Sequence, residues 1–304
     1  MNPDYLDTAR LLIQVAPLVF TDDQLALKGG TAINLFYRDM PRLSVDLDLI
    51  FADPHLPRRQ ALKRINTALH KSMKRLESHG FETRATSVAE AGETKLLVRR
   101  GKLVVKVEVN YVMRGTIFGT RQASLSVKAR DILLSDLEIP VVSLEDAYGG
   151  KLVAAMDRQH PRDLFDVMQL FAHEGITPGI RRAFVIYLAC HNRPVHEVLY
   201  PTLRDIRQDY ESGFKDMTTE PILLSQLLDA RERMVTELQG GMEQNERKFL
   251  LSLVRNVPDW NLIGPDHIRN LPGIRWKLRN IGALAKHNAR KFSEQGDVLA
   301  RLLG

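Results

Sequence analysis

Hydrophobic residues recur at helical spacing in three parts of the chain, which indicates amphipathic helices. The first twenty or so residues place apolar side chains on one face, at Leu6, Ala9, Leu12, Ile13 and Ala16. Residues 57–79 do the same, with Leu62, Ile65, Leu69, Met73 and Leu76. From Ser143 onward helical spacing dominates to the end of the chain. A short helix is also predicted over residues 32–37, because Pro41 disfavours a helix beyond that point.

Alternating apolar and polar residues predict strands between these helices. In residues 43–51, Val45, Leu47 and Leu49 alternate with Ser44, Asp46 and Asp48. Residues 94–98 and 103–111 flank Gly101, which predicts a hairpin. The fold class is therefore α+β: a mixed sheet with helices, followed by a mainly helical domain. We place the boundary after residue 142, which gives domains 1–142 and 143–304.

Composition and charge narrow the class of partner. The chain has 304 residues, 44% of them hydrophobic and 26% charged, with a net charge of +6. Eight Lys and Arg side chains after residue 268 oppose only Glu294 and Asp297, so this segment alone carries +6. Such a balance favours a polyanion as partner, and we expect the helical domain to bind RNA.

Targeting signals and disulfides are not predicted. No apolar run approaches the roughly 18 residues of a membrane helix, and the acidic first residues do not fit a secretory signal. We therefore expect a cytoplasmic protein that does not enter a membrane. Cys190 is the single cysteine, and its neighbours favour an inert thiol on a helix.

The most informative chemistry is a glycine pair followed by two carboxylates. Gly29 and Gly30 open a predicted helix, where backbone amides can bind phosphate oxygens and Thr31 can act as N-cap. Asp46 and Asp48 lie two residues apart, so both point from one face of a strand. Carboxylates in this arrangement suit Mg²⁺ (or Mn²⁺), and Glu108 on a second alternating strand is the candidate third ligand.

These motifs resemble those of a known family. The Gly-Gly-Thr and Asp-x-Asp strings are similar to the signature of the DNA polymerase β-like nucleotidyltransferases. Residues 27–35 and 42–49 resemble, more narrowly, the AbiEii/AbiGii-type toxins of type IV toxin–antitoxin and abortive-infection systems. Residues 106–110, 145–155, 162–166 and 276–280 are similar to later motifs of that family. Thr31 stands where the superfamily often has Ser, and 14 residues separate it from Asp46, which is a long interval.

The resemblance implies a fold, an activity and a site. It implies a polymerase β-like core and transfer of a nucleotide from a nucleoside triphosphate (NTP), with Mg²⁺, to the 3′ acceptor end of tRNA, which blocks translation. It implies catalytic roles for Asp46, Asp48, Glu108, Lys151, Asp163 and Asp166, the first three as metal ligands. It implies NTP binding by Lys28, Gly29, Gly30, Thr31, Arg42, Ser44, Lys151 and Arg162. A separate antitoxin chain is implied as well, without a stable complex.

Several alternatives stay open at this stage. Lys151 can reach a phosphate as a point charge, or pair with Asp163; which of Asp163 and Asp166 is functional is not fixed. Trp276 can stack on a base, but burial in the helical domain is the favoured interpretation. The acceptor can be a protein side chain or a small molecule such as an aminoglycoside. A non-catalytic module that binds nucleotide or RNA is the third hypothesis. The identity of the NTP, the RNA and the oligomeric state are not predicted.

Overall fold

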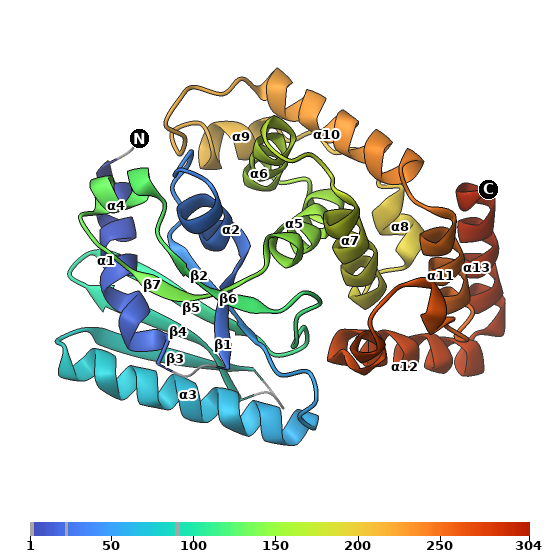
Figure 1. Cartoon of the computed structure of the whole chain (residues 1–304), viewed down its shortest axis with the longest axis horizontal. Coiled ribbons are helices and arrows are strands. Elements are labelled where there is room, and N and C mark those ends of the chain that lie inside the picture. The colour runs from blue at the N-terminus through green and yellow to red at the C-terminus, as the bar shows by residue number, and fades with distance from the viewer. Residues whose placement is uncertain (1–2, 22–23, 89–91) are drawn as a thin grey trace. The chain divides into compact units, whose positions relative to one another are not determined.

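A mixed seven-stranded sheet forms the centre of the first part of the chain in the computed structural model, which describes residues 3–21, 24–88 and 92–304 (Figure 1). The strand order is β3-β4-β5-β2-β1-β7-β6. The strands are β1 (Leu25–Lys28), β2 (Asp46–Phe51), β3 (Glu82–Val88), β4 (Gly92–Arg100), β5 (Leu103–Asn110), β6 (Thr120–Ser124) and β7 (Glu138–Val142). The predicted hairpin at Gly101 is confirmed, since β4 and β5 pair antiparallel.

Two helices pack on one face of this sheet. α1 (Pro3–Val19) and α3 (Arg58–Ser78) share a hydrophobic core with the β2 and β5 side chains that include Leu47, Leu49 and Val107. Both helices lie where the apolar spacing predicts them. α2 (Gly29–Ala32) continues as a π-helical turn, Ile33–Tyr37, and α4 (Val127–Leu133) follows β6. The α+β fold class is confirmed.

The chain divides into two compact units. The first comprises Met1–Ala147 and Glu211–Ile222; the second comprises Tyr148–Tyr210 and Leu223–Gly304. α5 (Leu144–Arg158) and α9 (Arg207–Gly213) each begin in one unit and end in the other. The second unit also holds α6 (Pro161–Ala172), α7 (Pro178–Cys190), α8 (Val195–Leu199), α10 (Leu224–Gly240), α11 (Gln244–Val254), α12 (Pro272–His287), α13 (Ala289–Leu303) and two 3₁₀ turns, Trp260–Leu262 and Asp266–Asn270.

The segment Glu211–Ile222 braces the loop that precedes β2. Leu43 N donates to Met217 O over 3.0 Å, and Thr219 N donates to Pro41 O over 3.0 Å. Arg42 and Thr218 form an isolated antiparallel bridge between these hydrogen bonds. This pairing explains why β2 begins at Asp46 rather than at Leu43, where alternation predicts it: the backbone before Asp46 pairs with a distant segment.

Among the helices that the structure describes, none combines the length and hydropathy needed to cross a membrane.

Candidate active site

The three predicted carboxylates lie on neighbouring strands of the first unit. In β2, Leu47 and Leu49 are fully buried against the helices, so Asp46 and Asp48 point to the opposite face. β2 runs parallel to β5, and Asp48 is the register partner of Glu108. Strands in a sheet are about 4.8 Å apart, so all three carboxylates share one small area of the sheet.

Lys106 lies on the same strand as Glu108 and is influenced by all three carboxylates. Burial disfavours the charged form of the Lys106 side chain. Its pKa is nevertheless raised, because the carboxylates of Asp46, Glu108 and Asp48 stabilise the ammonium. All three acidic side chains therefore lie close enough to Lys106 to stabilise its charge.

Glu108 already has two cationic partners. Its carboxylate lies 3.2 Å from Lys106 Nζ and 3.5 Å from Lys95 Nζ. Within the described residues, no group of three or more His, Cys, Asp or Glu side chains is arranged to hold a metal ion. Asp46 and Asp48 fit Mg²⁺ by the chemistry of their oxygen donors. Glu108 fits as a third donor only if it exchanges a lysine for the metal.

The two glycines lie between an anion and a cation. Gly29 has a φ of +74°, and a Cβ atom there would lie 2.8 Å from Asp48 Oδ2. A Cβ atom at Gly30 would lie 2.7 Å from an Arg42 guanidinium nitrogen and 3.2 Å from Ser44 Oγ. A side chain at either position would displace these groups. The glycines thus let the start of α2 approach Asp48 and Arg42 closely.

Thr31 joins this turn to the carboxylate strand. Its hydroxyl donates to Asp46 O over 2.5 Å and lies 2.9 Å from Ser44 Oγ. The prediction that Thr31 caps the helix is wrong. α2 begins two residues earlier, at Gly29, so Thr31 lies inside it and is buried. Its hydroxyl therefore contacts the neighbouring strand instead of the amides of its own helix.

The remaining predicted NTP-binding residues of this unit lie beside the same turn. Lys28 ends β1 and is the register partner of Asp48. The buried Arg42 guanidinium donates to Leu43 O over 3.0 Å and reaches Gly30. The structure therefore brings Lys28, Gly29, Gly30, Thr31, Arg42, Ser44, Asp46, Asp48 and Glu108 into one region.

A separate cluster of charges is buried in the second unit. Lys151 Nζ of α5 lies 2.8 Å from Asp163 Oδ1 and 2.9 Å from Asp166 Oδ2 of α6. Arg158 donates to the other Asp163 oxygen over 2.7 Å. Burial opposes the charged form of Asp163, but Lys151 and Arg158 outweigh it and lower the pKa of that carboxyl.

Arg162 lies in the first turn of α6, next to this cluster. The helix begins at Pro161, and the His160 ring accepts a hydrogen bond from Arg162 N over 3.2 Å. α5 approaches α7 closely at Gly149, where a Cβ atom would lie 2.4 Å from Ala183 Cβ. Gly149 therefore serves helix packing, whereas a Cβ atom at Gly150 would meet open space.

Comparison with known proteins identifies the family. The family model described as nucleotidyl transferase AbiEii toxin, type IV TA system, matches residues 10–280. The chain belongs to the AbiEii family. No curated protein matches the sequence. Membership confirms the resemblance seen in the motifs: this is a toxin-type nucleotidyltransferase, and the type IV system implies a cognate antitoxin.

A solved structure shows the same fold. MenT4, a nucleotidyltransferase toxin from Mycobacterium tuberculosis H37Rv, matches with a TM-score of 0.53 and 18% sequence identity. The match covers 91% of this AbiEii-family chain and 92% of the MenT4 chain. At this identity the comparison establishes the fold and does not assign site residues.

The prediction that Trp276 is buried is wrong: its side chain is 46% exposed. The buried face of α12 is formed by Ile274, Lys277 and Ile281, which contact the rest of the second unit. Trp276 lies two residues after Ile274, about 200° around the helix, and so faces outward. Lys277 is buried instead, and its ammonium donates to His191 O over 2.8 Å and to Arg193 O over 2.5 Å.

Sequence reasoning missed three residues around the AbiEii carboxylates and turn. Lys95 and Lys106 pair with Glu108, and the buried Asn34 donates from Nδ2 to Gly30 O over 2.9 Å. A signal existed for Asn34 and Lys106. Asn34 is four residues after Gly30, and Lys106 shares the polar face of its strand with Glu108. Lys95 required the strand register.

Proposed function

We propose that this AbiEii-family protein transfers a nucleotide from an NTP to the 3′ acceptor end of tRNA, and so blocks translation. In this reaction the RNA 3′-hydroxyl oxygen forms a bond to the α-phosphorus, and the bond to the departing pyrophosphate breaks. The hydroxyl proton passes to a base, for which Glu108 is the candidate. Family membership supports the reaction class, and the tRNA acceptor is our proposal.

The observation that carries this proposal is the position of the glycine pair. Gly29 and Gly30 lie between the Asp48 carboxylate and the Arg42 guanidinium, with no room for a side chain on either. An incoming triphosphate would bind the backbone amides of this glycine turn. Arg42 supplies a positive charge beside them, and Thr31 and Ser44 hold the turn against β2.

Asp46 and Asp48 would hold Mg²⁺ or Mn²⁺, with Glu108 as a third donor. When bound, such an ion neutralises triphosphate charge and lowers the pKa of a coordinated hydroxyl. The side chains of this unit orient the reactants. Positioning and charge neutralisation account for most of the catalysis in phosphoryl-type transfer.

The roles proposed for Lys151, Arg162, Asp163 and Asp166 follow from the geometry of the second unit alone. Asp163 and Asp166 both hold the Lys151 ammonium, so direct contact with a phosphate would require Lys151 to leave one of them. The geometry therefore favours a positioning role for Lys151, in which it fixes α5 against α6. Arg162, at the start of α6, is the better candidate for phosphate contact.

The exposed face of α12 supports RNA as the acceptor. Trp276 is flanked on this face by the exposed residues Arg275 and Arg279. An exposed aromatic ring beside guanidinium groups is typical of surfaces that stack a base and bind its phosphates. We propose that this face contacts the acceptor RNA, and that the antitoxin is a separate cytoplasmic chain that forms no stable complex with the toxin.

A transfer assay tests the proposal. Purified protein is incubated with Mg²⁺, total tRNA and each α-labelled NTP in turn, and RNA, protein and small molecules are then separated. We expect label on tRNA 3′ ends with one preferred NTP, and none with Asp48→Asn. Asp136→Asn, which removes a carboxylate exposed at the protein surface, is the matched control and should be fully active. Label on protein or on a small molecule would show that this molecule, and not tRNA, is the acceptor. Nucleotide binding without any transfer would show that the protein is not an enzyme of this class.

A further inference from the structure

Helix α3 carries a dense positive charge. Between Arg58 and Ser78 it has seven Lys and Arg residues and one acidic residue, Glu77. Its apolar side packs on the sheet, so the charges occupy the outward side. The carboxyl group of Glu77 accepts a hydrogen bond from Thr83 over 2.6 Å. In the described residues, no carboxylate forms an ion pair with Arg64 or Lys71.

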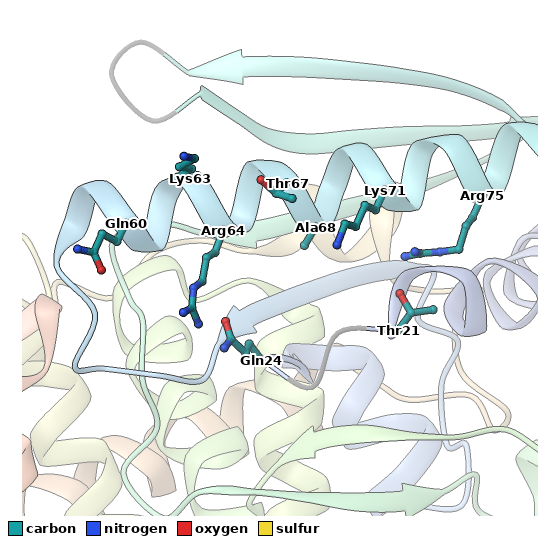
Figure 2. A pocket seen from close by; sticks show the side chains of 9 residues that line it. All are labelled: Thr21, Gln24, Gln60, Lys63, Arg64, Thr67, Ala68, Lys71 and Arg75. Atoms are coloured by element: carbon teal, nitrogen blue, oxygen red, sulfur yellow. The ribbon is translucent and has the colours of Figure 1, made fainter.

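A groove runs along this helix. It has a volume of about 800 Å³ and is lined by Thr21, Gln24, Gln60, Lys63, Arg64, Thr67, Ala68, Lys71 and Arg75. Figure 2 shows Arg64, Lys71 and Arg75 extending from α3 toward the segments that carry Thr21 and Gln24. These three basic residues lie at i, i+7 and i+11, which is one helix face and spans about 16 Å.

One end of the groove is held in place. Arg75 donates from Nε to Leu18 O over 3.0 Å and from its guanidinium to Ser72 Oγ over 3.1 Å. The first contact joins α3 to the end of α1, and the second holds the guanidinium against its own helix. Arg64 and Lys71 are exposed and lie in the same hollow. The groove thus has a fixed wall and three exposed cations, since the exposed Lys63 lines it as well.

The lining favours a polyanion over a small molecule. Pockets for small organic ligands are mostly apolar and aromatic, and none of the described residues that line this groove is aromatic. Cations spaced along a helix, with Thr and Gln side chains between them, instead match a row of phosphates. Without a stacking platform, such a surface binds a nucleic-acid backbone without reading its sequence.

We infer that the α3 groove binds the phosphate backbone of the acceptor RNA, away from the end that reacts. α3 packs on the Leu47 and Leu49 face of β2, and the Asp46 and Asp48 side chains point to the other face. The groove therefore contacts the body of a large RNA, whose 3′ end lies elsewhere. This inference rests on the proposed function for the identity of the RNA.

The test compares two double variants of the full-length protein. Arg64→Ala with Lys71→Ala removes two charges from the groove. Arg59→Ala with Lys74→Ala removes two exposed charges from the same helix outside the groove. Alanine is the best helix former, so both variants should keep α3 folded, which circular dichroism checks. Binding is measured by fluorescence anisotropy with end-labelled total tRNA from 50 to 200 mM salt.

We expect the groove variant to bind tRNA about tenfold more weakly than wild type at the lowest salt. Its slope of log K against log salt should be shallower by about 1.5, since each phosphate contact contributes about 0.7 to 0.9. The control variant should stay within about twofold of wild type. Equal losses of tRNA affinity in the two variants would mean that only the net charge of the protein matters, and would overturn the inference. The inference is also overturned if the groove variant loses tripolyphosphate binding but binds tRNA as wild type does, because the groove is then a site for a small anion.

Binding and transfer are read separately. A wild-type protein that binds tRNA through the groove but transfers no label would contradict the proposed function and leave the groove assignment intact. If both double variants label tRNA as well as wild type does and bind it with unchanged affinity, the groove assignment is contradicted and the proposed function is not.

Discussion

Gly29 and Asp48 approach so closely that a methyl group on Gly29 would lie 2.8 Å from the Asp48 Oδ2 atom. We predict that Gly29→Ala lowers nucleotidyl transfer by about 100-fold, because the carboxylate must move by a substantial fraction of an ångström. The steady-state transfer rate at saturating NTP measures this effect.

Gly80→Ala is the matched control. Gly80 has a φ of +78°, close to the +74° of Gly29, and a Cβ atom there would meet nothing within 4 Å. Both variants carry the backbone strain of a left-handed residue, about 1–2 kcal/mol, but only one displaces Asp48. Equal activity in the two variants would show that the glycine pair is needed for the turn and not for the site.

The Thr31 hydroxyl offers a finer test of the link between α2 and β2. Thr31→Val keeps the shape and removes the donor to Asp46 O. Loss of this hydrogen bond costs about 0.5–1.5 kcal/mol, which urea unfolding measures, and Asp46 loses a support that holds its strand. Thr31→Ser should restore both stability and transfer. If the Thr31→Val variant is as stable and as active as the Thr31→Ser variant, the hydroxyl has no positioning role.

Lys151 neutralises two buried carboxylates, and its removal should be costly. Lys151→Met removes the ammonium that lies within 3 Å of both Asp163 and Asp166, and the Arg158 guanidinium contacts Asp163 only through its other oxygen. We predict a loss of about 3–5 kcal/mol in the free energy of unfolding. Arg158→Met is the control, because that side chain is 61% exposed and such pairs contribute about 1 kcal/mol or less. Similar losses in both variants would mean that the cluster is not held by Lys151.

Lys277 should make stability depend on pH in the alkaline range. Burial lowers the pKa of this lysine from 10.5 to about 8. Between those values the unfolded chain binds the proton and the folded chain does not, so this residue's contribution to stability rises with pH. Wild type should gain about 1 kcal/mol relative to Lys277→Met between pH 7 and 9. Urea unfolding at each pH measures the difference, and a constant difference would contradict the lowered pKa.

The sequence predicted local structure best where one pattern controlled it. The long apolar rows of α1 and α3 and the alternation of β5 are local patterns. They predict these elements without knowledge of the segments that pack against them. The carboxylate strand was predicted for the same reason: Leu47 and Leu49 must enter the core, so Asp46 and Asp48 must leave it. The glycine pair could be recognised as a turn, but its contact with Arg42 could not.

The missed features depend on segments far apart in the sequence. Lys95 approaches Glu108 only through the register of β4 and β5. Trp276 was expected in the core because tryptophan is large and apolar. Its exposure is decided by which α12 side chains face inward, and there the aliphatic stem of Lys277 occupies the buried position. Neither result can be obtained from periodicity alone.

The brace formed by residues 217–219 has a consequence during synthesis. The loop that holds Arg42 pairs with a segment that is translated about 175 residues later, counting from Arg42 to Met217 and Thr218. A ribosome-bound chain that has exposed the whole sheet still lacks that partner strand, so Arg42 is not yet fixed beside Gly30. The nascent chain therefore completes the brace that holds Arg42 only after most of the protein has been made. Fragments from interrupted translation that end before Met217 lack this brace altogether.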